Sequence, residues 1–136
     1  MVCWVANDGT IGDEVWLSQR VRIDDGGEME ALNEPRPEDD GELSAFEGQH
    51  TAAAVYRKVR GAARRPIPPA SNADGVRYAR VGILRAAGFV VKRDPTRRNR
   101  DHLLIGRDGA WDDRAAVEFD QCFGDIVWHD ESGGST

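Results

Sequence analysis

Residues 81–106, VGILRAAGFVVKRDPTRRNRDHLLIG, constrain the fold more than any other part of the chain. Apolar residues at helical spacing lead to Gly88, and glycine readily adopts the positive φ with which many helices end. A β-branched segment, residues 89–91, follows, and a basic loop, residues 94–101, leads to a second apolar segment, residues 103–105. The pattern predicts a short helix followed by a β-hairpin whose loop is rich in arginine.

The N-terminal half has two further segments with clear periodicity. In the segment of residues 15–23, the side chains at positions 19, 21 and 23 alternate with Arg20 and Arg22. This alternation predicts a strand with one buried face. In residues 51–60, apolar side chains recur at i, i+3, i+4 and i+7, which predicts an amphipathic helix. Residues 44–47, SAFE, have the form of a capping box, so we also expect a helix to begin there. Residues 2–6 are apolar and could form a first strand.

The region before the central helix allows two interpretations. Three good N-cap residues precede it: Ser71, Asn72 and Asp74. The alternative is a short strand over residues 76–78, with the helix beginning near Ala79. Further on, Asp112 is expected to cap a last helix, and residues 125–129 could form a final strand.

These elements predict one α+β domain over residues 1–136, with a small, mostly antiparallel sheet and two or three packed helices. A chain of 136 residues suffices for one domain with a single core. Residues 24–42 are rich in Asp, Glu, Gly and Pro, which predicts an acidic flexible loop. Residues 132–136 are expected to be a frayed tail.

The sequence gives no sign of a membrane or secretory segment. Its longest apolar runs are four or five residues, and a membrane-spanning helix needs about 20. Cys3 and Cys122 form no CxxC pair, so we expect two reduced thiols in a cytoplasmic protein, with a disulfide as the alternative. Arginine outnumbers lysine sixteen to two, and this bias suggests a high-GC bacterium or its phage.

The net charge of −6 hides three blocks of opposite sign. Residues 1–50 hold 13 acidic and 3 basic side chains, net −10. Residues 51–107 hold 3 acidic and 14 basic ones, net +11, and residues 108–136 hold 8 acidic and 1 basic, net −7. In one interpretation the flanks neutralise the centre within the fold through surface ion pairs. In the other, the centre forms a basic face that attracts an anionic partner.

The basic hairpin loop is the first candidate for a functional site. Guanidinium groups bind phosphate with two parallel hydrogen bonds, so the loop could bind phosphate, nucleic acid or a protein partner. Its candidate binding residues are Arg93, Arg97, Arg98 and Arg100. The alternative is a solvated hairpin tip that pairs with the acidic flanks. His102 opens the next strand and is the candidate catalytic residue if the protein is a nuclease.

Other chemistry is poorly supported by the sequence. His50 and His129 are isolated, and no pair of residues has the spacing of metal ligands, so we predict no metal and no cofactor. The chain has four tryptophans: Trp4, Trp16, Trp111 and Trp128. We expect them in the core or at its edge. If they are exposed, they would instead mark a partner surface.

Two resemblances arise at the central stretch. LRAAGFVVKR, followed by a histidine-led strand and a Gly-Arg-Asp-Gly turn, resembles the core of HicA-type mRNA interferase toxins, which are small dsRBD-like domains. That resemblance implies that His102 matches a catalytic histidine. The stretch is also similar to a group of uncharacterised small actinobacterial proteins, and this similarity implies a structural loop. The matching positions are Asp94, Pro95, Asn99, His102 and Ile105.

We therefore expect a small non-enzymatic protein-interaction domain of a bacterial or phage conflict system: an antitoxin, an immunity protein or a defence accessory protein. The grounds are small size, segregated charge, abundant tryptophan and the lack of a catalytic motif. The alternative is an RNA-binding domain or ribonuclease toxin that uses the arginine loop and His102. We expect a protein partner, with nucleic acid as the alternative ligand of the loop, and no membrane association.

Overall fold

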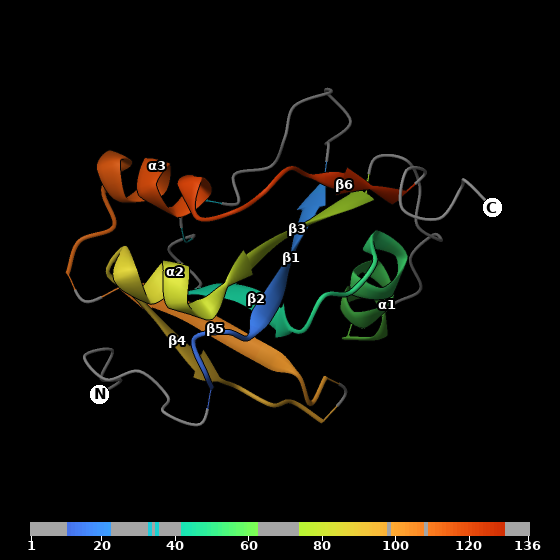
Figure 1. The fold of residues 1–136 in the computed structure, drawn as a ribbon. Helices are drawn as coiled ribbons and strands as arrows, with labels where there is room; N and C mark the ends of the chain where they lie inside the picture. Colours follow the sequence, from blue (N-terminus) through green and yellow to red (C-terminus); the bar gives the residue numbers. More distant parts are fainter. Residues whose placement is uncertain are drawn as a thin grey trace.

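The computed structural model describes residues 11–22, 33, 35, 42–62, 74–97, 99–107 and 109–129. In these residues six strands form one sheet in the order β4-β5-β2-β1-β3-β6, and all neighbouring strands are antiparallel (Figure 1). The strands are β1 (Trp16–Arg22), β2 (Leu43–Glu47), β3 (Asp74–Arg80), β4 (Phe89–Arg93), β5 (His102–Arg107) and β6 (Val127–Trp128). The helices are α1 (Ala52–Ala62), α2 (Val81–Ala86) and α3 (Asp113–Gln121). The predicted α+β class is confirmed.

The pairing of β1 with β3 forms the centre of the sheet. Its register runs from Trp16 opposite Arg80 to Arg22 opposite Asp74. Successive side chains of a strand point to opposite faces of the sheet. Leu17 is fully buried on one face, and Ser18 is fully buried on the other. The central strand is thus covered on both sides.

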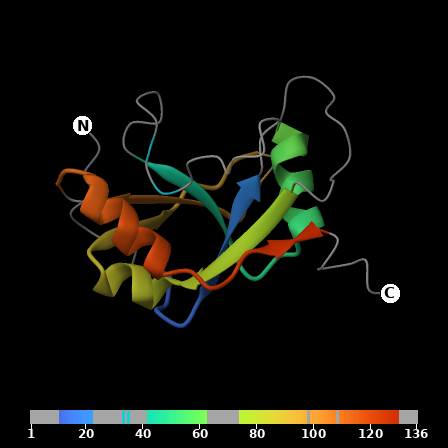
Figure 2. The ribbon, with the colours of Figure 1, turned by 90° about the horizontal axis from the view of Figure 1, so that it is seen from above.

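The helices cover the two faces unequally. The larger core lies on the face of Leu17, where α2 and α3 pack, and it includes Leu84, Phe89 and Phe119. The smaller core lies on the opposite face under α1, and it consists of Phe46, Ala52, Val55 and Val76. Figure 2 shows α1 well separated from α2 and α3. Helix α1 is therefore the only described helix on its face of the sheet.

The central helix-hairpin agrees with the sequence prediction. Helix α2 ends before Gly88, which has a φ of 95° and whose N–H donates to Arg85 O at 3.0 Å. Strand β4 then pairs with β5 from Phe89 opposite Arg107 to Arg93 opposite Leu103. The glycine allows the left-handed turn, and the β-branched segment forms the strand.

The helix expected from the capping box at residues 44–47 is wrong, because these residues belong to β2. Ala45 is fully buried and Phe46 is 5% exposed, between the neighbouring strands β1 and β5. The helix begins later, and its cap is Thr51, whose Oγ1 accepts a hydrogen bond from Ala54 N–H at 3.1 Å. Burial against two strands thus overrides the local signal.

The N-cap interpretation of Asp74 is also wrong, because Asp74 begins β3. The alternative, a strand before the helix, is confirmed and the strand is longer than expected. Helix α2 follows β3 at once and uses no side-chain cap. Its first N–H groups, of Val81 and Gly82, each donate at 2.9 Å to carbonyl oxygens of Val15 and Asp13. Tertiary contacts replace the cap.

The remaining predictions divide between confirmed ones and untested ones. Asp112 caps α3, since its Oδ1 accepts a hydrogen bond from Ala115 N–H at 2.8 Å. The final strand is β6, with only two residues. Cys3, Trp4, the strand at residues 2–6, the tail at residues 132–136 and most of the acidic loop lie outside the described residues. Among described residues, no helix has the length and apolar character needed to cross a membrane.

We predict that Gly75→Ala destabilises the protein by about 1–3 kcal/mol, because the new methyl overpacks a filled site. A Cβ at Gly75 would lie 2.8 Å from Trp128 Cε3 and 3.1 Å from Val127 O. Gly124→Ala is the control, since a Cβ there meets nothing within 4 Å. Urea unfolding measures both variants. Equal stabilities of the two variants would contradict the packing of β6 on β3.

Candidate functional site

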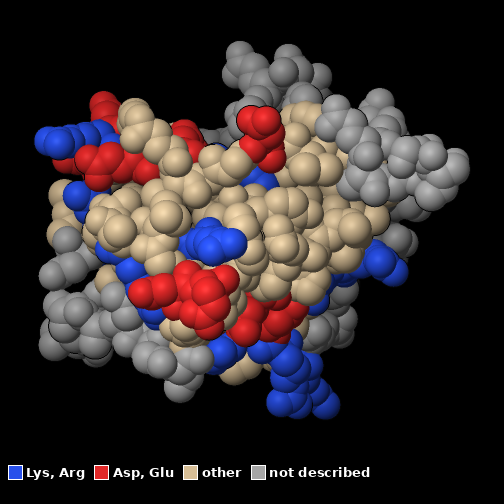
Figure 3. All heavy atoms as spheres, in the orientation of Figure 1, with Lys and Arg blue, Asp and Glu red and all other residues tan. Residues whose placement is uncertain are grey.

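The loop between β4 and β5 divides the predicted arginines into paired and exposed ones. Arg93 forms an ion pair with Glu47 of β2. Arg97 and Arg100 are exposed, and neither forms an ion pair with another residue that the structure describes. Arg98 lies outside the described residues. Figure 3 shows basic side chains projecting at the lower margin, where Figure 1 places this loop.

His102 faces into the hairpin. Its Nδ1 lies 3.1 Å from both the backbone oxygen and Oδ2 of Asp94, and its side chain is only 14% exposed. The imidazole packs edge-on against Phe46, with 5.7 Å between ring centroids. These contacts close the hairpin at the start of β5. A catalytic role of His102 stays a prediction.

Asn99 fixes the loop against α1. Its side-chain Nδ2 donates to Lys58 O at 3.0 Å, and its backbone oxygen accepts hydrogen bonds from Thr96 N–H and His102 N–H. Asn99 is 9% exposed, so these bonds are largely shielded from water. These bonds therefore hold the backbone of the loop against α1.

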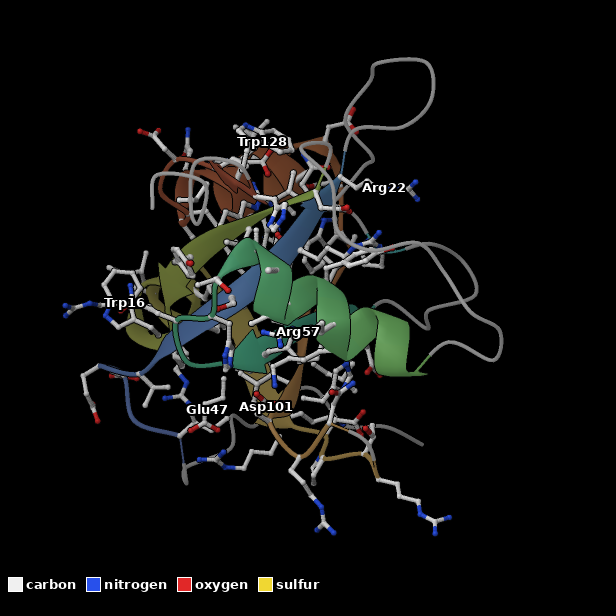
Figure 4. The ribbon with its side chains drawn as sticks, turned by 90° about the vertical axis from the view of Figure 1, so that its right-hand side faces the viewer. Trp16, Arg22, Glu47, Arg57, Asp101 and Trp128 are labelled. Carbon is white, nitrogen blue, oxygen red and sulfur yellow. The ribbon has the colours of Figure 1, made fainter. Side chains whose placement is uncertain are left out.

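A charged cluster that the sequence did not reveal joins the same loop to α1 and β2 (Figure 4). Asp101 Oδ2 lies 2.7 Å from Lys58 Nζ and 3.1 Å from His50 Nε2. The backbone adds a bond of 2.8 Å from Glu47 N–H to Asp101 O. The residues come from three separate elements, and no local pattern relates them.

The electrostatics of this cluster favour an ionised Asp101. Burial alone would raise the pKa of the carboxyl, but the hydrogen bond and charge of Lys58 outweigh it, and the charge of His50 adds to them. The net pKa of Asp101 lies below its ordinary value of 3.8. The lowered pKa means that the folded state stabilises the charged form.

His50 is also fixed through its backbone. Its N–H donates to Ser18 Oγ at 2.9 Å, and its carbonyl oxygen accepts from the Tyr78 hydroxyl at 2.5 Å. The Nε2 atom lies 2.7 Å from Glu47 O as well. His50 thereby ties the connection between β2 and α1 to both central strands.

Several ion pairs join the acidic flanks of the sequence to its basic centre. Besides the pair of Glu47 with Arg93, Asp13 pairs with Arg85 at 2.7 Å, and Asp120 pairs with Arg77 at 2.8 Å. The charge blocks thus mix in the fold, as in the first interpretation of the charge pattern. Among the residues that the structure describes, no ion pair includes Arg97 or Arg100 of the loop tip.

An open groove with a volume of about 390 Å³ lies between the paired strands β1 and β3, helix α2 and the segment after α3. We call it the Trp16 groove; it runs from β1 and the end of β3 to α2 and the segment after α3. Residues that line it include Trp16, Tyr78, Arg80, Ile83, Phe123 and Gly124. In Figure 4, Trp16 lies beside α1 and not beneath it.

One wall of the groove is a stacked pair. The guanidinium carbon of Arg80 lies 4.7 Å from the centroid of the Trp16 ring, which is a cation–π geometry. The neighbouring Tyr78 is half-buried, and its hydroxyl bond to His50 holds the ring in place. Burial raises the pKa of Tyr78. This wall is thus aromatic and uncharged except for Arg80.

The opposite wall contains Phe123, which is supported from behind by a buried guanidinium. Arg77 Cζ lies 4.2 Å from the Phe123 ring centroid, and the Arg77 side chain is only 8% exposed. Its Nε donates to Gln19 at 2.7 Å and its Nη1 to Asp120 at 2.8 Å. Burial lowers the pKa of Arg77, and Asp120 opposes that shift. The ion pair fixes this wall in one position.

Ile83 and Gly124 leave the groove open. Ile83 is 53% exposed, and the one other large exposed apolar residue among those described is Val117, at 55%. Val117 lies on α3 and does not line the groove. Gly124 has free space where a side chain would stand. The groove thus combines exposed apolar surface with room for a ligand.

Cys122 also borders the groove and is a free thiol. Its sulfur lies 3.3 Å from Glu118 O. Burial and the charge of Glu118 raise the pKa of Cys122, and Arg77 opposes them. A raised pKa keeps the thiol protonated at neutral pH, when it is a poor nucleophile.

Comparison of the chain with models of known protein families, with curated proteins and with solved structures finds no match. The two resemblances in the sequence therefore stay predictions. Within the described residues, no three His, Cys, Asp or Glu side chains are grouped as metal ligands would be. The loop and the groove are thus the features of the structure that bear on function.

We predict that Asp101→Asn lowers the free energy of unfolding at pH 7 by about 0.5–1.5 kcal/mol, because Lys58 loses its carboxylate partner. The pKa of Asp101 is lower in the folded state than in the unfolded state, so its carboxylate stabilises the protein fully at pH values above the unfolded-state pKa. The effect is lost as the pH falls through 3.8 and below. Urea unfolding at neutral and acidic pH measures the difference.

Asp125→Asn is the matched control, because Asp125 is exposed and forms no ion pair with a described residue. Its effect should stay below about 0.5 kcal/mol at either pH. An Asp101→Asn effect that is the same at acidic and neutral pH would show that charge plays no part.

Proposed function

We propose that this protein is a non-enzymatic protein-interaction domain that binds its partner in the Trp16 groove. The observation that carries the proposal is the exposed Ile83 beside a groove with aromatic walls. The setting that we propose is a bacterial or phage conflict system, with the protein as antitoxin, immunity protein or defence accessory. The small size of the chain supports that setting.

The residue types of the groove support a binding role. Protein interfaces are enriched in Trp, Tyr, Phe and Arg, and their strongest contacts lie in well-packed pockets. The groove offers all four types in Trp16, Tyr78, Phe123 and Arg80. Fixed walls reduce the entropy that a partner must overcome on binding. The hydrogen bond of Tyr78 and the ion pair of Arg77 supply that rigidity.

The histidines of the charged clusters also favour binding over catalysis. His50 and His102 each lie within 3.1 Å of a carboxylate, as a catalytic base often does. Both are engaged in contacts that hold the hairpin and the start of α1. These contacts support a structural role for both side chains.

A second candidate function is RNA binding or RNA cleavage at the hairpin tip. The observation that favours it is the pair of exposed arginines, Arg97 and Arg100, on a loop that Asn99 holds in place. Such side chains could contact phosphates. In this alternative, His102 would be the catalytic residue.

We predict that a stoichiometric partner co-purifies with the wild-type protein and with Val117→Asp, but not with Ile83→Asp. Each substitution adds one carboxylate to a helix at a half-exposed apolar site, so the two match in chemistry. Only Ile83→Asp puts a charge in the groove, where we expect at least about tenfold weaker binding. Mass determination of the purified complexes measures the stoichiometry.

Circular dichroism and urea unfolding show whether both variants fold. Equal capture of the partner by Ile83→Asp and by the wild type would contradict the proposed site. Loss of the partner from Val117→Asp alone would place the interface on α3.

If the groove is the functional surface, the double variant Arg97→Ala/Arg100→Ala should bind single-stranded RNA at low salt as weakly as the control variant Arg114→Ala does. Arg114 is 88% exposed on α3, so it reports non-specific attraction. A loss of about tenfold or more confined to the loop variant, with a steep salt dependence, would favour the second candidate. Filter binding over a salt series measures this.

A further inference from the structure

We propose that the occupant of the Trp16 groove is a proline-rich segment of the partner, in the polyproline II conformation, with a basic residue next to its prolines. This inference rests on the proposed function and names the chemistry of its ligand. It is carried by the polar groups left available on the walls, by the aromatic surface and by the charge of Asp125.

Three side chains that line the groove have hydrogen-bond donors available. The indole N–H of Trp16, the amide of Gln49 and the guanidinium of Arg80 form no hydrogen bond in the part of the chain that the structure describes. The hydroxyl of Tyr78 already donates to His50 O. A fitting ligand therefore presents acceptors to these three side chains.

A proline-rich segment has this property. Proline has no backbone N–H, and the carbonyl groups of a polyproline II helix form no internal hydrogen bonds. An α-helix instead uses its carbonyl groups internally, so it would leave the donors of the groove unmatched. The arrangement of donors thus favours polyproline II over a helix.

The walls suit proline rings. Proline-rich segments dock in aromatic-lined grooves, and their preformed conformation reduces the entropy lost on binding. Here the rings of Trp16 and Phe123 and the side chain of Ile83 provide the apolar surface. The free space above Gly124 leaves room for a ring against the backbone.

The charge of the groove suggests a basic neighbour. Asp125 lines the groove and is exposed, and it pairs with no cation among the described residues. Arg80, the one basic residue of the lining, stacks on Trp16. A Lys or Arg of the ligand would complement Asp125, with the modest gain of a surface ion pair.

The test is a titration, followed by fluorescence anisotropy, of the full chain into a labelled peptide of about eight prolines followed by two arginines. We expect the wild type and Val117→Asp to bind equally. Ile83→Asp and Gly124→Trp should bind at least about tenfold more weakly. Gly124→Trp fills the groove at a position that has free space and no positive φ, so it should fold even if Ile83→Asp does not.

Two control peptides test the chemistry. A peptide with Gly-Ser repeats in place of the prolines should bind at least about tenfold more weakly, because it lacks the preformed conformation. A peptide with two glutamates in place of the arginines should bind about threefold more weakly to the wild type. That difference should vanish in Asp125→Asn.

Three results would overturn the inference: the wild type does not bind the proline peptide, it binds the Gly-Ser peptide as tightly as the proline peptide, or Ile83→Asp and Gly124→Trp bind the proline peptide as tightly as the wild type does. A groove closed by a second copy of the chain, seen as a doubled mass that Ile83→Asp abolishes, would also overturn it. If the peptide fails but the natural partner still requires Ile83, this inference is wrong and the proposed function stands.

Discussion

The unequal cover of the sheet is the constraint on which the rest of the structure depends. One face carries α2 and α3 over a large core, and the other carries α1, whose Ala52 and Val55 form a smaller core with Phe46 and Val76. The pairing of β1 with β3 extends past the end of α1 and leaves Trp16 and Tyr78 only half-buried. A sheet that extends past its helix exposes apolar surface, and such surface is typical of a binding site.

Buried polar groups give that exposed surface a fixed shape. His50 connects the start of α1 to Ser18 and Tyr78, while Asp101 holds the hairpin loop to α1 through Lys58. Arg77 holds Phe123 from behind. An ion pair at low exposure costs desolvation free energy, so its benefit lies mainly in fixing one arrangement of its neighbours. These contacts hold the walls of the groove and the described part of the hairpin loop in place.

Local patterns in the sequence predicted the central hairpin, α1, β1 and the Asp112 cap, because those signals agree with the tertiary contacts. They failed at β2, where the capping-box pattern competes with burial of Ala45 and Phe46 between two strands. The basic loop was predicted from the sequence. The ion pair that makes Arg93 unlike the exposed arginines of the loop was not, because it depends on Glu47 in another strand. The groove was missed because distant segments line it, and Trp16 in isolation resembles a core residue.

Hydrogen–deuterium exchange of the complex with its natural partner distinguishes the two candidate surfaces, because it reports on the groove and on the hairpin tip together. Binding in the Trp16 groove predicts slower exchange at residues 78–83 and 122–125 and unchanged exchange at residues 94–101. Protection of residues 94–101 alone would contradict it and would place the functional surface at the arginine loop.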